Sequence, residues 1–137
     1  MIRDGTMLNN SVLIVDDDID ALEEMADALQ DYGLKIHTAS DGDAALMLAN
    51  EHRPEFILMD YLLHGSTGVE TAFAIRKFLP GVQIIMISAF ENLNRVVTIK
   101  NCGVIAVLRK PLSMNSIGRF ISTRLTHKKR QLKSLKN

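Results

Sequence analysis

The sequence predicts an α/β fold in which helices cover both faces of an open, parallel β-sheet. Five short, strand-sized runs rich in apolar residues alternate with five amphipathic stretches that have helical spacing. This alternation is typical of a parallel sheet built from right-handed crossovers. Four of the five runs are continuously apolar, as expected for strands buried on both faces. The 137 residues suffice for one such domain and leave no room for a second.

The five strands are predicted at residues 12–15, 35–39, 56–59, 83–87 and 104–108. Helices are predicted between and after them, because apolar residues recur there every three or four positions. The apolar faces of these helices comprise, in order, Ile19, Leu22, Ala26 and Leu29; Ala45, Leu48 and Ala49; Val69, Ala72 and Phe73; Leu93, Val96 and Val97; and Ile117, Phe120, Ile121 and Leu125.

Turn-forming residues support these boundaries. Gly33 and Gly103 follow predicted helices, and Pro54 and Pro80 precede predicted strands. Glycine commonly ends helices and proline cannot continue them, so both placements agree with the division. Ser113 is the predicted N-cap of the last helix.

The folded domain is expected to span residues 11–126. Residues 1–10 are predicted to form a flexible N-terminal segment, and residues 127–137 a basic C-terminal tail or an extension of the last helix. The single cysteine cannot form an internal disulfide, and no secretory signal is visible. The apolar runs are far shorter than the roughly 20 residues of a membrane span. These features predict a soluble, cytoplasmic protein that does not enter a membrane.

Charge is divided unevenly along the chain, although the formal net charge is zero. All 16 acidic residues lie at or before Glu91, together with only five basic residues, whereas residues 92–137 contain 11 basic residues and no acidic one. Because summed charge attracts partners of opposite sign, this division predicts a cation-binding front half and a basic surface on the remainder.

Side chains that can handle phosphate or a hard metal follow four of the predicted strands. They are Asp16, Asp17 and Asp18 after the first strand, Asp60 after the third, Ser88 after the fourth and Lys110 after the fifth. The carboxyl ends of parallel strands share one edge of a sheet, so these residues are expected to converge there. The sequence therefore predicts an acidic pocket that accepts phosphate. Asp18 and Asp20 are assigned instead to the start of the first helix, where acidic residues are favourable.

The segments VLIVDDD, FILMD, IIMISA and VLRKP resemble, in order and spacing, the receiver domain of two-component response regulators. The resemblance covers about residues 11–125. It implies a flavodoxin-like, doubly wound sheet of five parallel strands in the order 2-1-3-4-5, with five helices. It also implies a cis peptide bond between Lys110 and Pro111.

The resemblance further implies a role for each strand-end residue. Asp60 would be the phosphoacceptor, whose carboxylate attacks phosphorus to form an acyl phosphate. Ser88 and Lys110 would contact the phosphoryl oxygens. The implied cofactor is Mg²⁺, which favours oxygen ligands. The implied ligands are Asp16, Asp17, Asp60 and the backbone carbonyl of Leu62.

The implied function is to accept a phosphoryl group from a sensor histidine kinase or phosphotransfer protein and to signal by a conformational change. Such a chain is a signalling domain and not an enzyme in the usual sense, although it catalyses its own phosphorylation and dephosphorylation. A homodimer through the face of the fourth helix, fifth strand and fifth helix is a further implied partnership. Nucleic acid is not expected to bind this chain, because no DNA-reading element is visible.

Several positions depart from the family pattern and leave alternatives open. His64 and Thr67 replace a proline and an aspartate in the loop after Asp60, and Val107 replaces an aromatic residue in the fifth strand. These changes keep open a degenerate receiver that binds a partner without phosphorylation. A haloacid-dehalogenase-like phosphatase would also have an Asp-x-Asp after the first strand. Such enzymes need a later acidic motif, however, and no acidic residue follows Glu91.

Overall fold

The computed structural model describes residues 9–63, 65–89 and 103–135. Its main sheet contains five parallel strands in the order β2-β1-β3-β6-β7. These strands are β1 (Ser11–Val15), β2 (Lys35–Ala39), β3 (Phe56–Asp60), β6 (Gln83–Ser88) and β7 (Val104–Arg109). Each lies within one residue of its predicted range. Because β4 and β5 belong to a separate small sheet, this order is the predicted 2-1-3-4-5 arrangement.

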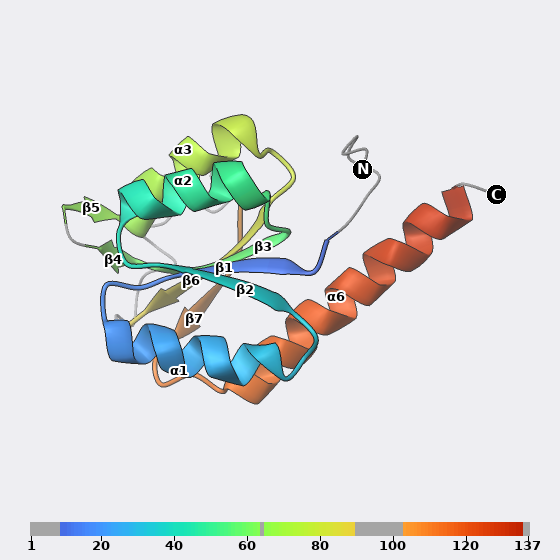
Figure 1. The fold of residues 1–137 in the computed structure, drawn as a ribbon, viewed down its shortest axis with the longest axis horizontal. Coiled ribbons are helices and arrows are strands. Elements are labelled where there is room, and N and C mark those ends of the chain that lie inside the picture. Colours follow the sequence, from blue (N-terminus) through green and yellow to red (C-terminus); the bar gives the residue numbers. More distant parts are fainter. Residues whose placement is uncertain (1–8, 64, 90–102, 136–137) are drawn as a thin grey trace.

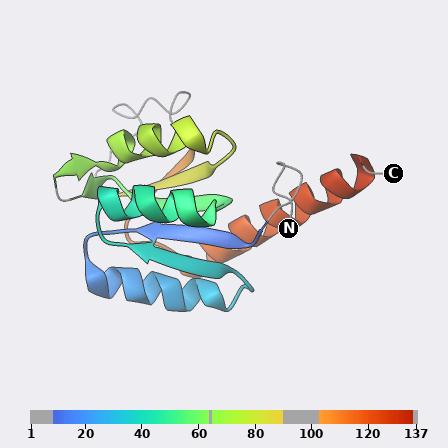
Figure 2. The ribbon, with the colours of Figure 1, turned by 45° about the horizontal axis from the view of Figure 1, so that its top comes forward.

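Helices cover both faces of the sheet (Figures 1 and 2). The helices in the described residues are α1 (Ile19–Gln30), α2 (Gly42–His52), α3 (Gly68–Phe78) and α6 (Met114–Leu135). The pair α2 and α3 lies on one face, and α1 and α6 lie on the other (Figure 1). The helix predicted around Leu93, Val96 and Val97 falls outside the described residues.

The sheet separates two apolar cores. Successive residues of a strand point to opposite faces, so β1 contributes Leu13 and Val15 to the core under α2 and α3. It contributes Val12 and Ile14 to the core under α1 and α6. β1, β3 and β6 are buried along their whole length, which explains their continuous apolar sequences.

Side-chain caps fix where the helices begin. Asp18 caps α1 by accepting hydrogen bonds from the backbone N–H groups of Asp20 and Ala21, at 3.1 and 3.3 Å. Thr67 caps α3, since its Oγ1 accepts from the N–H of Glu70 at 3.3 Å. These caps satisfy donors that have no partner inside the helix. The assignment of Asp18 to the helix start is confirmed.

A short hairpin that the sequence did not predict follows β3. It consists of the antiparallel strands β4 (Leu62–Leu63) and β5 (Ser66–Thr67). Gly65 between them has a φ of +79°, a left-handed conformation that glycine adopts without steric cost. The hairpin carries the chain from the end of β3 to the start of α3.

The last helix, α6, is continuous from Met114 to Leu135. Its first turns pack on α1 and on Tyr32, which follows α1. Gly118 lies so close to the ring of Tyr32 that a Cβ atom would collide with it. Further along, Lys128 lies 3.9 Å from Glu55. Beyond this point the helix projects away from the sheet (Figures 1 and 2). Within the residues that the structure describes, no helix is both long and apolar enough to span a membrane.

A stacked histidine pair joins β2 to α2 and predicts a pH dependence of stability. The rings of His37 and His52 are 3.7 Å apart and nearly parallel, at 12°. Burial, then the neighbouring His52 and Lys35, lower the pKa of His37 below its ordinary 6.5, against a smaller opposing effect of Glu51. The unfolded chain therefore binds more protons on acidification than the folded chain does.

This contribution to stability is complete above about pH 6.5 and is lost as the pH falls through the lowered pKa of His37. We expect the unfolding free energy, measured in denaturant at several pH values, to fall less between about pH 7 and pH 5 in His37→Gln than in the wild type. A change at the exposed His127, His127→Gln, should keep the wild-type dependence. Identical slopes in all three proteins would refute a role for the stack.

Candidate functional site

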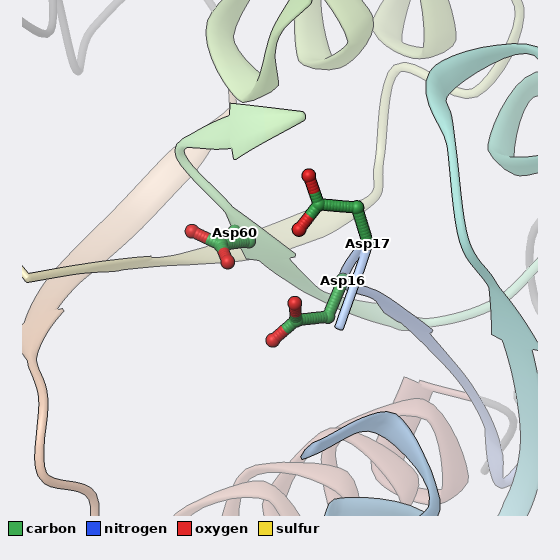
Figure 3. Close-up of side chains that lie close together, drawn as sticks. All are labelled: Asp16, Asp17 and Asp60. Atoms are coloured by element: carbon green, nitrogen blue, oxygen red, sulfur yellow. The ribbon is translucent and has the colours of Figure 1, made fainter. Parts of the chain in front are cut away.

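Four strand ends meet at one edge of the sheet and form an acidic pocket. Asp16 and Asp17 follow β1, and Asp60 ends the neighbouring strand β3. One carboxylate oxygen from each of the three lies within 4.8 Å of the others, and Figure 3 shows the three side chains gathered around a common space. The predicted convergence is thus present for these residues, because adjacent parallel strands end side by side.

Lys110 brings a positive charge to the pocket from the end of β7. Its Nζ donates a hydrogen bond to Asp60 Oδ2 at 3.2 Å and lies 3.8 Å from Asp16 Oδ2. Burial alone would lower the pKa of Lys110, but the carboxylates of Asp60 and Asp16 outweigh burial and raise it. Lys110 therefore stays charged at neutral pH. The peptide bond that follows it, before Pro111, is cis, as predicted.

Asp16 is the most enclosed acid of the pocket, with 1% of its surface exposed. Its Oδ1 accepts a hydrogen bond from the Asp18 N–H at 2.9 Å, whereas its buried Oδ2 accepts none. Burial raises the pKa of Asp16, the Asp18 N–H opposes that rise, and the nearby Asp60 adds to it. An enclosed carboxylate with an unsatisfied oxygen, beside two other acids, favours a bound cation.

Asp60 is held in place mainly by its backbone. The Tyr61 N–H donates to the Ile87 carbonyl at 2.8 Å, which ties the end of β3 to β6. Gly68, the first residue of α3, packs against the backbone carbonyl of Asp60, where a Cβ atom would collide. The Asp60 Oδ1 atom also accepts a long hydrogen bond of 3.4 Å from the Leu62 N–H.

The hairpin leaves the Leu62 carbonyl outside its hydrogen-bonded ladder. β4 and β5 pair Leu62 with Thr67, and the Gly68 N–H donates to the Tyr61 carbonyl at 2.6 Å. Bonded and non-bonded pairs alternate along an antiparallel ladder, so the Leu62–Thr67 pair next to this bond is a non-bonded one. The oxygen of the Leu62 carbonyl is therefore available to coordinate a bound cation. The Leu62 side chain is 51% exposed beside the pocket.

The remaining predicted residues differ in how they relate to the pocket. Ser88 is buried at the end of β6, next to β3, and its carbonyl accepts from the Lys110 N–H at 2.9 Å. Val107 is partly buried and packs against the core under α2 and α3. His64 falls outside the described residues.

Two features near Asp60 were missed by sequence reasoning. The first is the β4–β5 hairpin, and the second is the close packing of Gly68 on the Asp60 carbonyl. The spacing of Gly65 and Gly68 in the sequence does not reveal which backbone atom a glycine approaches. The Thr67 cap had a clearer signal, since threonine followed three residues later by glutamate, here Glu70, often starts a helix.

Fold and site together define a doubly wound α/β domain with an acidic pocket and a lysine at the carboxyl edge of its sheet. The family model of the response regulator receiver domain matches residues 12–122. The chain therefore belongs to the response regulator receiver domain family.

Individual relatives agree with this assignment. The nitrogen assimilation regulatory protein NtrX of Azorhizobium caulinodans is 33% identical over 133 residues, which cover 92% of this chain and 29% of NtrX. Sporulation initiation phosphotransferase F of Bacillus subtilis is 24% identical over 81% of this chain and 90% of its own length. The chain spans between 26% and 46% of the length of four curated relatives, NtrX among them.

Solved structures show the same fold. A CheY-like receiver domain from Methanospirillum hungatei has a TM-score of 0.80 at 25% identity and covers 91% of this chain and 99% of its own. The chemotaxis protein CheY4 of Vibrio cholerae has a TM-score of 0.76 at 27% identity, covering 85% and 98% respectively. The recognised family and the flavodoxin-like fold class are thereby confirmed.

Proposed function

We propose that this chain accepts a phosphoryl group on Asp60 in a Mg²⁺-dependent reaction and passes the signal on by a conformational change. The observation that carries the proposal is the contact of Lys110 Nζ with Asp60 Oδ2, at 3.2 Å, beside the carboxylates of Asp16 and Asp17. A nucleophile, a cation for the phosphoryl oxygens and oxygen ligands for a metal thus lie in one pocket.

The residues of the pocket fit a divalent, oxygen-binding cation. Among the residues that the structure describes, three carboxylates face one lysine, so the pocket has an excess of negative charge. The buried Asp16 Oδ2 atom without a hydrogen bond supports the same reading. Asp16, Asp17, Asp60 and the Leu62 carbonyl would hold Mg²⁺, the ion that suits a small set of oxygen ligands. When bound, Mg²⁺ supplies charge neutralisation for the incoming phosphoryl group.

In the proposed transfer, a carboxylate oxygen of Asp60 attacks the phosphorus of a phosphohistidine. The new O–P bond forms as the P–N bond breaks, and the histidine nitrogen keeps the electron pair and takes up a proton. Lys110 moves from the carboxylate to a phosphoryl oxygen and offsets its charge, while Ser88 donates a hydrogen bond from the end of β6. Hydrolysis would remove the phosphoryl group: water attacks phosphorus and the O–P bond to Asp60 breaks. The Asp60 carboxylate is regenerated and inorganic phosphate leaves.

The proposed donor is a sensor histidine kinase or a phosphotransfer protein, which would meet the chain in the cytoplasm. Membership of the receiver family supports this partner, and the relative from Bacillus subtilis is itself called a phosphotransferase. We propose that the face of the fourth helix, β7 and α6 carries the output, including a homodimer. In related receivers an aromatic residue at the position of Val107 turns inward on phosphorylation, and valine cannot do so. The signal would therefore be weak or be carried by the Ser88 loop and the predicted fourth helix.

Incubation with acetyl phosphate tests the proposal against a phosphorylation-independent binding module. We expect the intact mass to increase by one phosphoryl group in the presence of Mg²⁺ and not in the presence of a chelator. We also expect Mg²⁺ alone to stabilise the fold, by about 2.7 kcal/mol at 100 times its dissociation constant. This stabilisation should be visible as a higher midpoint of thermal unfolding. A chain that binds Mg²⁺ but gains no mass under any condition would favour the binding module.

A further inference from the structure

Two surfaces of this chain carry opposite charge and matching apolar groups. Helix α1 contains four acidic residues and no basic one. Helix α6 contains no acidic residue, and its last turns, after Thr126, contain Lys128, Lys129, Arg130 and Lys133. Association of the acidic surface with the basic one would neutralise charge on both.

The acidic surface contains a groove of about 500 Å³ between α1 and the edge strand β2. Leu22, Ala26 and Ile36 form its apolar lining, and Glu23 and Asp27, one helical turn apart, supply its charge. Ile19 at one end of the groove is 53% exposed. The groove therefore suits an amphipathic segment with apolar side chains and flanking cations.

The far end of α6 is such a segment. Ile117, Ile121 and Leu125 of this helix are buried, and helical spacing places Leu132 and Leu135 on the continuation of the same stripe. There the stripe has passed the end of the sheet, and Leu135 is 82% exposed. Lys129 and Lys133, four residues apart, run along one side of the stripe, as Glu23 and Asp27 do along the groove. Within its own copy Lys129 Nζ donates a hydrogen bond to the amide oxygen of the exposed Asn10 at 2.6 Å, and a carboxylate of the groove would replace this neutral partner.

Two other arrangements of the basic last turns of α6 are excluded. They neither fill the groove of their own copy nor pack against the same turns of a second copy. Because α6 is one continuous helix that projects away from the sheet and from α1, it does not turn back into its own groove (Figures 1 and 2). The last turns of two α6 helices packed on each other would bring cations against cations, since the helix has no acidic residue to pair with them.

We propose that residues 129–135 of α6 dock in the α1–β2 groove of a second copy of this chain. Lys129 and Lys133 pair with Glu23 and Asp27, while Leu132 and Leu135 cover the apolar lining. A reciprocal exchange makes this contact twice and closes a dimer, whereas a one-way contact extends into a chain of copies. The proposal does not depend on phosphorylation. It also does not depend on a homodimer through the fourth helix, β7 and α6, because β2 and β7 are opposite edges of the sheet. Its failure would therefore leave the proposed function untouched.

Charge exchange between the two surfaces tests this contact. Sedimentation equilibrium should show concentration-dependent association of the wild type at low ionic strength, and dissociation as added salt screens the exposed charges. The groove variant Glu23→Lys with Asp27→Lys and the tail variant Lys129→Glu with Lys133→Glu should each raise the dissociation constant by at least about tenfold. The variant that carries all four changes restores opposite charges and should associate like the wild type.

A surface change elsewhere provides the matched control. Lys77 is exposed on α3, outside both surfaces, so Lys77→Glu should associate as the wild type does. Circular dichroism of every variant shows whether the fold is kept. The proposal is overturned if the wild type stays monomeric at low salt, or if the fourfold variant does not recover association. If the wild type binds duplex DNA in a titration but does not self-associate, the basic helix serves nucleic acid and the proposal is likewise overturned.

Discussion

Replacing Asp60 with asparagine is expected to lower the rate of phosphoryl incorporation from acetyl phosphate by at least about 10³-fold. Asparagine has nearly the same shape, so the strand end and its contacts should persist. The amide oxygen is a far weaker nucleophile, however, and the change removes one of the three negative charges that favour the metal. Incorporation is measured as the gain in intact mass over time with Mg²⁺ present.

The matched control for this variant is Asp43→Asn. Asp43 is exposed in the first turn of α2 and does not belong to the cluster of Asp16, Asp17 and Asp60. It should incorporate phosphoryl groups at the wild-type rate. If Asp60→Asn remained as active as this control, the acceptor would have to be another residue and the assignment of Asp60 would be wrong.

The second large effect is expected from Gly68→Ala. The added Cβ would collide with the Asp60 backbone carbonyl and would lie 2.9 Å from Met59 Cγ and 3.0 Å from Met86 Sδ. Backbone cannot give way cheaply, so we expect the unfolding free energy to drop by about 1–3 kcal/mol or more. Because the displaced backbone belongs to Asp60, phosphoryl incorporation should slow as well. Urea unfolding measures the first effect and mass spectrometry the second.

Gly81→Ala separates this collision from the general cost of changing a glycine. A Cβ at Gly81 would meet no atom within 4 Å, so this variant should be as stable as the wild type or slightly more so. Equal stability of the two alanine variants would show that α3 can shift away from β3. The close packing would then not be what holds Asp60 in place.

The main sheet and the pocket could be predicted from the sequence for the same reason. Strands buried on both faces must be apolar throughout, so β1, β3 and β6 are visible as runs that end abruptly in polar residues. Parallel strands then bring those ends together without further information. Asp16, Asp60 and Lys110 lie in contact because they occupy such ends.

Other features could not be predicted because their signals are short or non-local. The strands β4 and β5 have two residues each, which is too few for any periodicity. The stacking of His37 on His52 depends on how α2 packs over an edge strand, which no local sequence pattern shows. The polar end of α6 left a tail and a helix extension as equal alternatives, and the structure continues the helix to Leu135.

The central claim is that Asp60 carries the phosphoryl group, and chemical trapping tests it most directly. The chain is incubated with acetyl phosphate and Mg²⁺, and borohydride then reduces any acyl phosphate to an alcohol, which converts the modified aspartate to homoserine. Peptide mass spectrometry locates the conversion. We predict homoserine at position 60 alone, and none when Mg²⁺ is chelated. Conversion at a different aspartate, or none in a chain shown to bind Mg²⁺, would contradict the account.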